Sequence, residues 1–223
     1  MTTVIKTISF GLNNVYLINA GDGFVLVDTG LKKNWQQLEK ELLSAGCLPD
    51  KLKLVIITHG DTDHVGNCRI LQEKYNAKIA IHPYDVKMLE TGFLPKRTFG
   101  NALVNKLFTI LSKSLERKNN KKESTILCKP DLLIDEGFDL DEYNIQARIL
   151  HFPGHTRGSI AVLFEDGSLI CGDTFVNFTK PVIWKLLEDE EGCKATIDKY
   201  RRLKVHIIYP GHGKPFTPEK LKL

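Results

Sequence analysis

Six consecutive residues of this 223-residue chain carry four side chains that could bind a metal ion. They form the segment His59-Gly-Asp61-Thr-Asp63-His64. Imidazole nitrogens and carboxylate oxygens of this kind suit zinc, iron or manganese. Taken singly, each has an ordinary explanation: Asp63 could cap a helix, His64 could lie on its surface, and Asp61 could belong to a turn. Together, directly after a short apolar run, they predict a metal site.

Three further side chains follow the same pattern of an apolar run, a glycine and a potential ligand. They are His155, Asp173 and His212, and each has a glycine directly before it. A glycine lets the backbone bend tightly around a ligand. We therefore expect these three side chains to join the first four at one centre.

The elements around these candidates predict strands that end at them. Residues 54–57 form a continuous apolar run, typical of a strand buried on both faces. A helix over 65–75 and a strand over 78–81 complete a βαβ pattern, which places loop residues at the carboxyl end of a sheet. Earlier in the chain, strand-forming runs at 15–18 and 24–27 flank a Gly-Asp-Gly turn and predict a β-hairpin.

The rest of the chain predicts two halves, each rich in strands and then helical. A helix over 34–45 should end at Gly46. Further expected elements are strands near 132–134, 145–150, 159–164 and 168–171, a helix over 184–202 and a strand over 205–209.

Residues 84–122 interrupt this rhythm and predict a helical insertion. Its apolar stripe of Leu103, Leu107, Ile110 and Leu115 either packs on its own domain or forms a lid over the metals. Basic residues are concentrated from 96 to 122, so a lid would attract an anionic substrate. Aromatic residues do not interleave with them, which argues against nucleic acid. The stripe is also too short to predict stable membrane association.

Composition indicates one ordinary globular domain over residues 1–223. Hydrophobic residues make up 42% and charged residues 26%, and the net charge is a mild +4. No apolar run approaches the roughly 20 residues that span a bilayer, and the N-terminus lacks a signal sequence, so we expect a cytoplasmic protein. The oligomeric state cannot be derived from these features.

The five cysteines are odd in number and contain no C-x-x-C pair. This argues against disulfides and against a thiolate zinc site, and predicts reduced, mostly buried thiols. Any metal must then be held by histidine and carboxylate. The three histidines outside the pattern are expected to be structural, with His151 the best candidate for an outer hydrogen-bond partner of a metal ligand.

These motifs resemble the metallo-β-lactamase superfamily. The family signature H-x-H-x-D-H-x-G is similar to the segment from His59 to Gly66, and the P-G-H-T loop is similar to the one containing His155. The G-D motif matches at Asp173, and the terminal P-G-H matches at His212. The resemblance extends from residue 28 to residue 212 and implies a four-layer αββα sandwich with metals at one edge.

The resemblance also implies a ligand set for two divalent metals. His59, His155 and position 61 would hold the first metal, and Asp63 with His64 and His212 would hold the second. Asp173 would bridge the two. Asp28, which matches an early strand-end aspartate of the family, would support the ligand loop without binding metal.

The chain departs from the family at Asp61, where most members have histidine. An anionic oxygen donor shifts preference from zinc toward iron or manganese. Zinc remains our favoured metal, with iron and manganese as alternatives.

Two metals about 3.5–4 Å apart can activate a water molecule for attack on a carbonyl or phosphorus centre. Asp63, matching the family's second-metal aspartate, would orient that nucleophile and accept its proton. We therefore expect hydrolysis of an ester-like bond (a thioester, lactone or phosphoester) in a small molecule, which would be anionic if the basic insertion forms a lid. An iron-dependent oxidoreductase and a non-catalytic metal-binding protein are the competing hypotheses.

Overall fold

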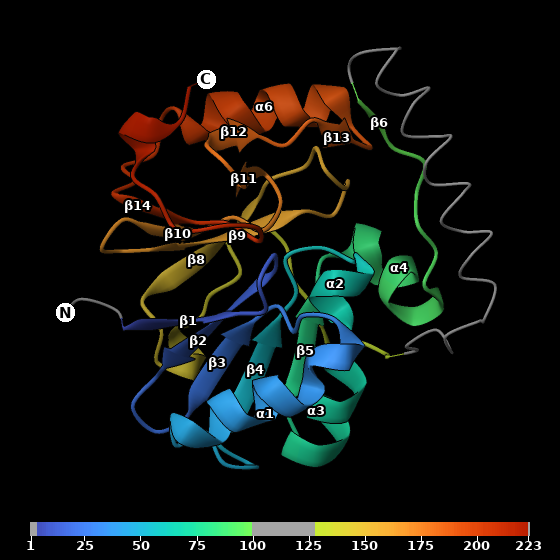
Figure 1. Ribbon diagram of the computed structural model, residues 1–223, viewed down its shortest axis with the longest axis vertical. Helices are drawn as coiled ribbons and strands as arrows, with labels where there is room; N and C mark the ends of the chain where they lie inside the picture. Colours follow the sequence, from blue (N-terminus) through green and yellow to red (C-terminus); the bar gives the residue numbers. More distant parts are fainter. Residues whose placement is uncertain (1–3, 100–127, 223) are drawn as a thin grey trace.

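The structure, a computed structural model, describes residues 4–99 and 128–222. Two β-sheets lie face to face between two layers of helices (Figure 1). The first sheet has the order β1-β2-β3-β4-β5-β7 and the second has the order β14-β10-β9-β8. Strands β3, β4, β5 and β7 are mutually parallel, as the βαβ pattern predicts.

The bounds of the strands in the first sheet are β1 Ile5–Ser9, β2 Asn14–Asn19, β3 Phe24–Val27, β4 Leu52–Ile56, β5 Lys78–Ile81 and β7 Leu132–Leu133. Those in the second sheet are β8 Ala147–His151, β9 Ile160–Phe164, β10 Ser168–Ile170 and β14 Ile207–Tyr209. The α-helices are α1 Trp35–Ser44, α2 Thr62–Val65, α3 Cys68–Tyr75, α4 Val86–Thr91 and α6 Glu190–Tyr200. Two short pairs, β6 Thr98–Phe99 with β13 Leu186–Leu187 and β11 Phe175–Asn177 with β12 Pro181–Ile183, complete the strands. Short 3-10 helices are η1 Lys32–Asn34, η2 Pro83–Asp85, η3 Asp141–Tyr143 and η4 Pro218–Lys220.

Three apolar layers hold the sandwich together. Leu38 of α1 and Leu71 of α3 lie in a cluster on the outer face of the first sheet. Ile56 of β4 and Val162 of β9 belong to the cluster between the two sheets. Ile197 of α6 belongs to a third cluster that covers the outer face of the second sheet. This arrangement confirms the expected four-layer αββα sandwich.

A small core truncation should measure the packing between the sheets. Ile56 is 0% exposed, so Ile56→Val should leave an unfilled methyl-sized gap and cost about 1 kcal/mol of unfolding free energy. Leu48, which is 53% exposed, is the control: Leu48→Ala removes more atoms but should stay within about 0.5 kcal/mol. Urea denaturation of both variants measures this, and equal losses would contradict a tightly packed inter-sheet core.

Local signals of the sequence are confirmed in the first half of the chain. The Gly-Asp-Gly turn joins β2 to β3, with Asn19 paired to Phe24. Helix α1 buries Leu38 and Leu42 and stops before Gly46, whose φ of 80° requires a residue that tolerates the left-handed region. The apolar run near residue 54 is β4, buried on both faces between β3 and β5.

The predicted helix over 184–202 is wrong at its start. Residues Leu186–Leu187 are β13 and pair with β6, so their backbone groups are already bonded. The helix begins at Glu190, where the Asp189 side chain accepts a hydrogen bond from the Gly192 N–H at 2.9 Å. The pairing of β13 with β6 and the cap at Asp189 therefore determine where the helix starts, although the residues before it have helical spacing.

The helical insertion predicted over 84–122 can be followed only at its beginning. Helix α4 ends at Thr91, with Gly92 as its C-cap, and the chain is then extended at β6. The apolar stripe from Leu103 to Leu115 lies outside the described residues. Within 4–99 and 128–222, no helix is both long enough and apolar enough to cross a membrane. All five cysteines are free thiols, and four of them are buried, as expected.

Candidate metal centre

Four strand ends bring the seven predicted side chains together. The segment from His59 to His64 follows β4 and includes the short helix α2. His155 follows β8, Asp173 follows β10, and His212 follows β14. Because β10 and β14 are parallel neighbours, Asp173 and His212 leave the second sheet at the same edge. His59 and His212, which are 153 positions apart in the sequence, thus come together at the ends of strands from both sheets.

The side chains form two groups whose potential ligand atoms all lie within 4.8 Å of one another. The first group is His59, His155 and Asp173, and the second group is Asp63, His64 and His212. Asp173 also contacts the second group: its Oδ2 lies 3.1 Å from His212 Nε2, and its Oδ1 lies 3.5 Å from His64 Nε2. One carboxylate therefore faces both groups.

Asp61 lies beside the first group. Its Oδ2 is 3.5 Å from His59 Nε2 and 3.0 Å from His155 Nε2. Within the described residues it is the one member of the seven that is ion-paired with an arginine, because the Arg97 guanidinium donates to both of its oxygens. The structure thus brings all seven predicted side chains together, and adds a cation that the sequence pattern does not reveal.

Each of the four histidines is fixed by a hydrogen bond at Nδ1. The partners are Thr58 Oγ1 for His59 at 3.1 Å, Asp28 Oδ2 for His64 at 2.8 Å, the Leu186 carbonyl for His155 at 2.8 Å and the Leu12 carbonyl for His212 at 3.0 Å. With Nδ1 bonded to its outer partner, Nε2 is the nitrogen that faces the centre, and it can bind a metal as the neutral imidazole. The outer partners thus present four Nε2 atoms toward the carboxylates.

His151 is not one of these partners, which corrects the prediction for it. Its Nε2 lies 2.8 Å from the Arg157 carbonyl, and its ring stacks on His82 with centroids 4.4 Å apart. Asp28, by contrast, has the supporting role expected of it. Its carboxylate accepts from the Thr58 N–H at 2.8 Å and contacts His64, and its φ of 62° is the left-handed conformation that non-glycine residues rarely adopt.

Several buried atoms of the cluster have no hydrogen-bond partner within the described residues. They are His59 Nε2, His64 Nε2 and Asp173 Oδ1. A buried polar atom without a partner costs roughly 1–3 kcal/mol. Two imidazole nitrogens and a carboxylate oxygen pointing into one space are the donor atoms that zinc binds. The residues present therefore fit a divalent cation.

The backbone of Gly211 packs directly against the side chains of Asp173 and His64. A Cβ at this position would lie 2.4 Å from Asp173 Oδ1 and 2.8 Å from His64 Cε1. Any side chain would push these two groups apart. The glycine of the terminal motif is thus required by the packing of the cluster.

The electrostatics of the cluster are those of a cation site. Burial alone lowers the pKa of His64, but the carboxylates of Asp28, Asp63 and Asp173 raise it to about 10. Burial alone raises the pKa of Asp173, but the neighbouring His64 and His212 hold it below its usual value. The negative potential of several close carboxylates thus favours positive charge at this point.

Two residues that position the clustered side chains were not predicted from the sequence. Asn13 Nδ2 donates to Asp63 Oδ2 at 2.6 Å and so fixes the carboxylate of the second group. Asp85, which is 1% exposed, accepts from the Gly60 N–H and the Thr156 hydroxyl at 2.8 Å and from the Gly158 N–H at 3.0 Å. Neither residue belongs to a local motif, so no signal in the sequence could have found it.

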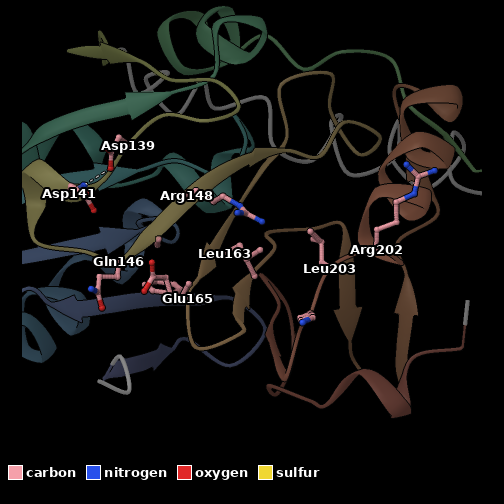
Figure 2. Close-up of a pocket in the computed structure, with 11 residues that line it drawn as sticks. Asp139, Asp141, Gln146, Arg148, Leu163, Glu165, Arg202 and Leu203 are labelled. Carbon is pink, nitrogen blue, oxygen red and sulfur yellow. Dashed lines mark hydrogen bonds between the residues drawn. The ribbon is translucent and has the colours of Figure 1, made fainter.

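Other features of the described residues do not extend this centre. His82, Asp135 and His151 also cluster, but both His82 nitrogens are engaged, since Nδ1 accepts from the Tyr84 N–H and Nε2 faces Asp135. A cavity of about 550 Å³ lies against β8 and β9, where Figure 2 shows Arg148 and Glu165 among its lining residues. None of the seven clustered side chains lines it.

The fold and the cluster together define an αββα protein with a metal-binding centre at the strand ends. A family model of the metallo-beta-lactamase superfamily matches residues 8–212. The chain belongs to this superfamily, and it is a metallo-hydrolase of it. The resemblance noted in the sequence is thereby confirmed.

Several proteins that are similar to this chain carry the names of hydrolases. The chain is 29% identical over 216 residues to the probable metallo-hydrolase MJ0888 of Methanocaldococcus jannaschii, covering 94% of this chain and 92% of that protein. It is 23% identical to the human acyl-coenzyme A thioesterase MBLAC2, covering 93% of this chain and 75% of that one. Among solved structures, the subclass B3 metallo-beta-lactamase BJP-1 of Bradyrhizobium japonicum superposes with a TM-score of 0.68 at 18% identity, covering 93% of this chain and 74% of that one. This last likeness confirms the fold.

Proposed function

We propose that this hydrolase cleaves an ester-like bond in a small molecule at the clustered histidines and aspartates. The observation that carries the proposal is the convergence of buried His59 Nε2, His64 Nε2 and Asp173 Oδ1, none of which has a hydrogen-bond partner within the described residues. The proposed ligands form two positions: His59, Asp61 and His155 at the first position, and Asp63, His64 and His212 at the second, with Asp173 shared. Zinc is the proposed metal at both.

When bound, a divalent cation supplies a Lewis acid that makes water a nucleophile near neutral pH. The chain's own residues then orient the attack and move the proton. Asp63 is 29% exposed and is held by Asn13, so its carboxylate reaches the edge of the centre in a fixed direction. We assign it the role of orienting the attacking water and accepting its proton.

Thioesters, lactones and phosphoesters are the substrate classes this chemistry allows. The similarity to an acyl-coenzyme A thioesterase over 93% of the chain supports testing acyl thioesters first. The iron-dependent oxidoreductase is not favoured, because its one supporting observation was the carboxylate of Asp61. In the structure both oxygens of that carboxylate accept hydrogen bonds from Arg97.

A substrate panel on zinc-loaded protein tests this proposal. We expect turnover of at least one of the three classes, and removal of metal by a chelator should reduce it by roughly 100-fold or more. Adding zinc back should restore the rate, which separates metal loss from unfolding. Activity that survives complete metal removal, or no hydrolysis of any class by protein shown to contain zinc, would refute the proposed function.

A further inference from the structure

The guanidinium of Arg97 lies inside the metal centre. Arg97 precedes β6, and its side chain is only 10% exposed. Nη1 donates to Asp61 Oδ2 at 2.5 Å and Nη2 donates to Asp61 Oδ1 at 2.6 Å. Two parallel, charge-assisted bonds of this kind are the strongest geometry available to an arginine–carboxylate pair. Asp61 therefore has a full cationic partner before any metal binds.

The same guanidinium also contacts His155. Nη1 lies 3.2 Å from His155 Nε2, while His155 Nδ1 lies 2.8 Å from the Leu186 carbonyl. A carbonyl can only accept, so His155 Nδ1 carries the hydrogen, and in the neutral imidazole, the form that binds metal, Nε2 offers a lone pair. That lone pair faces Asp61 Oδ2 at 3.0 Å, which would place two acceptors in contact. Arg97 Nη1 resolves this conflict because it donates to both.

One nitrogen of Arg97 thus bridges a carboxylate oxygen and an imidazole nitrogen, as a metal cation at the first position would. Burial disfavours an isolated guanidinium and an isolated carboxylate, but here the two opposite charges are buried as a pair. At the second position the contacts differ. The carboxylate of Asp63 is contacted there by the neutral amide of Asn13 and by His212 Nε2 at 3.4 Å, and within the described residues no arginine or lysine pairs with it. The two positions are therefore unequal before metal binds.

We propose that Arg97 acts as an internal cation at the first position and makes the two metal positions bind with different affinity. The first divalent ion binds Asp63, His64, His212 and Asp173. A second ion binds at His59, His155 and Asp61 only when it displaces the guanidinium. This inference deepens the proposed function, since it concerns the metal occupancy of the same centre.

A zinc titration of the metal-free full chain by calorimetry tests the inference without any substrate. The wild-type protein should bind one equivalent tightly and a second much more weakly. Arg97→Met keeps the side-chain length and removes the charge. It should strengthen the weak step by about 10- to 100-fold, the equivalent of losing charge-assisted hydrogen bonds that compete with the metal, and should change the tight step by less than about threefold.

Three further variants sharpen the comparison. Arg97→Lys keeps the charge but offers no bidentate fork, so its weak step should fall between those of wild type and Arg97→Met. Arg69→Met is the matched control, because Arg69 is 62% exposed on α3 and pairs with Glu73. It should leave both steps unchanged. If Arg97→Met fails to fold, Asp61→His decides, since it removes the partner of Arg97 and supplies a neutral nitrogen ligand.

Some outcomes would overturn the inference. Two wild-type equivalents of equal affinity would do so, as would an unchanged weak step in both Arg97→Met and Asp61→His. These results would leave the hydrolysis proposal intact, because binding is measured without turnover. Conversely, the expected titration with no hydrolysis of any panel substrate would refute the proposed function alone. Absence of zinc binding by the wild-type chain would refute both.

Discussion

Asp173→Asn should lower kcat/KM toward the substrate found in the panel by about a thousandfold or more. Asp173 is 6% exposed, and its two oxygens face His212 at 3.1 Å and His64 at 3.5 Å. Asparagine keeps the shape but removes the negative charge that both positions share. Zinc titration of the same variant should show weaker binding at both steps, which separates this shared ligand from Arg97, where one step changes.

Asp198→Asn is the matched control for this substitution. Asp198 is 63% exposed on α6 and pairs with Arg201, so the same chemical change there should leave kcat/KM and zinc binding unaltered. The prediction fails if Asp173→Asn retains more than a tenth of wild-type kcat/KM while binding zinc normally. Such a result would mean that Asp173 does not take part in the centre that performs hydrolysis.

The sequence predicts most of the centre because its candidates follow strands directly. Each buried apolar run gives the position of a strand, and its carboxyl end fixes where the next few residues must lie. His59 after β4 and His212 after β14 are found this way. Parallel strands bring such ends to one edge, so residues far apart in the chain can be assigned to one site.

The residues that tune the centre could not be found in this way. Arg97 contacts Asp61 36 positions away, and Asn13 contacts Asp63 50 positions away. Neither stands in a motif, and an arginine among many basic residues gives no sign that it is buried. The region predicted as a helix over 184–202 begins instead with the strand β13. This strand could not be predicted for the same reason, because its partner strand β6 is remote in sequence. The local sequence pattern shows the periodicity of single helices and strands. The contacts of Arg97 and Asn13 and the pairing of β13 with β6 depend instead on which remote segments pack together.

Asp85 shows how such a remote residue can control the metal ligands. Its carboxylate accepts from the Gly60 N–H, next to His59, and from the Thr156 hydroxyl, next to His155. Its other oxygen accepts from the Gly158 N–H at 3.0 Å, and a Cβ at Gly158 would lie 2.5 Å from that oxygen. The loops that follow β4 and β8 are therefore tied to one buried carboxylate.

Asp85→Ala should lower the free energy of unfolding by about 3–5 kcal/mol, because it leaves three donors in a buried space without their acceptor. It should also weaken zinc binding at His59 and His155 more than at Asp63 and His64. Urea denaturation and the zinc titration measure the two effects. Asp131→Ala is the control, since Asp131 also accepts a backbone hydrogen bond, from the Ile79 N–H at 2.8 Å, but is exposed, and its other partner within the described residues is Gln72 on α3 rather than a ligand loop.

The control should lose stability modestly and bind zinc as the wild type does, because its carboxylate is hydrated and a water molecule can replace it. In Asp85→Ala the space closes around unsatisfied N–H groups, and the loops must move to reach other acceptors. Such movement displaces His59 and His155 from the positions that their Nδ1 partners fix. If Asp85→Ala proves no less stable than Asp131→Ala, or binds zinc with wild-type affinity at both steps, the two loops are held by their own contacts and Asp85 has no part in positioning the ligands.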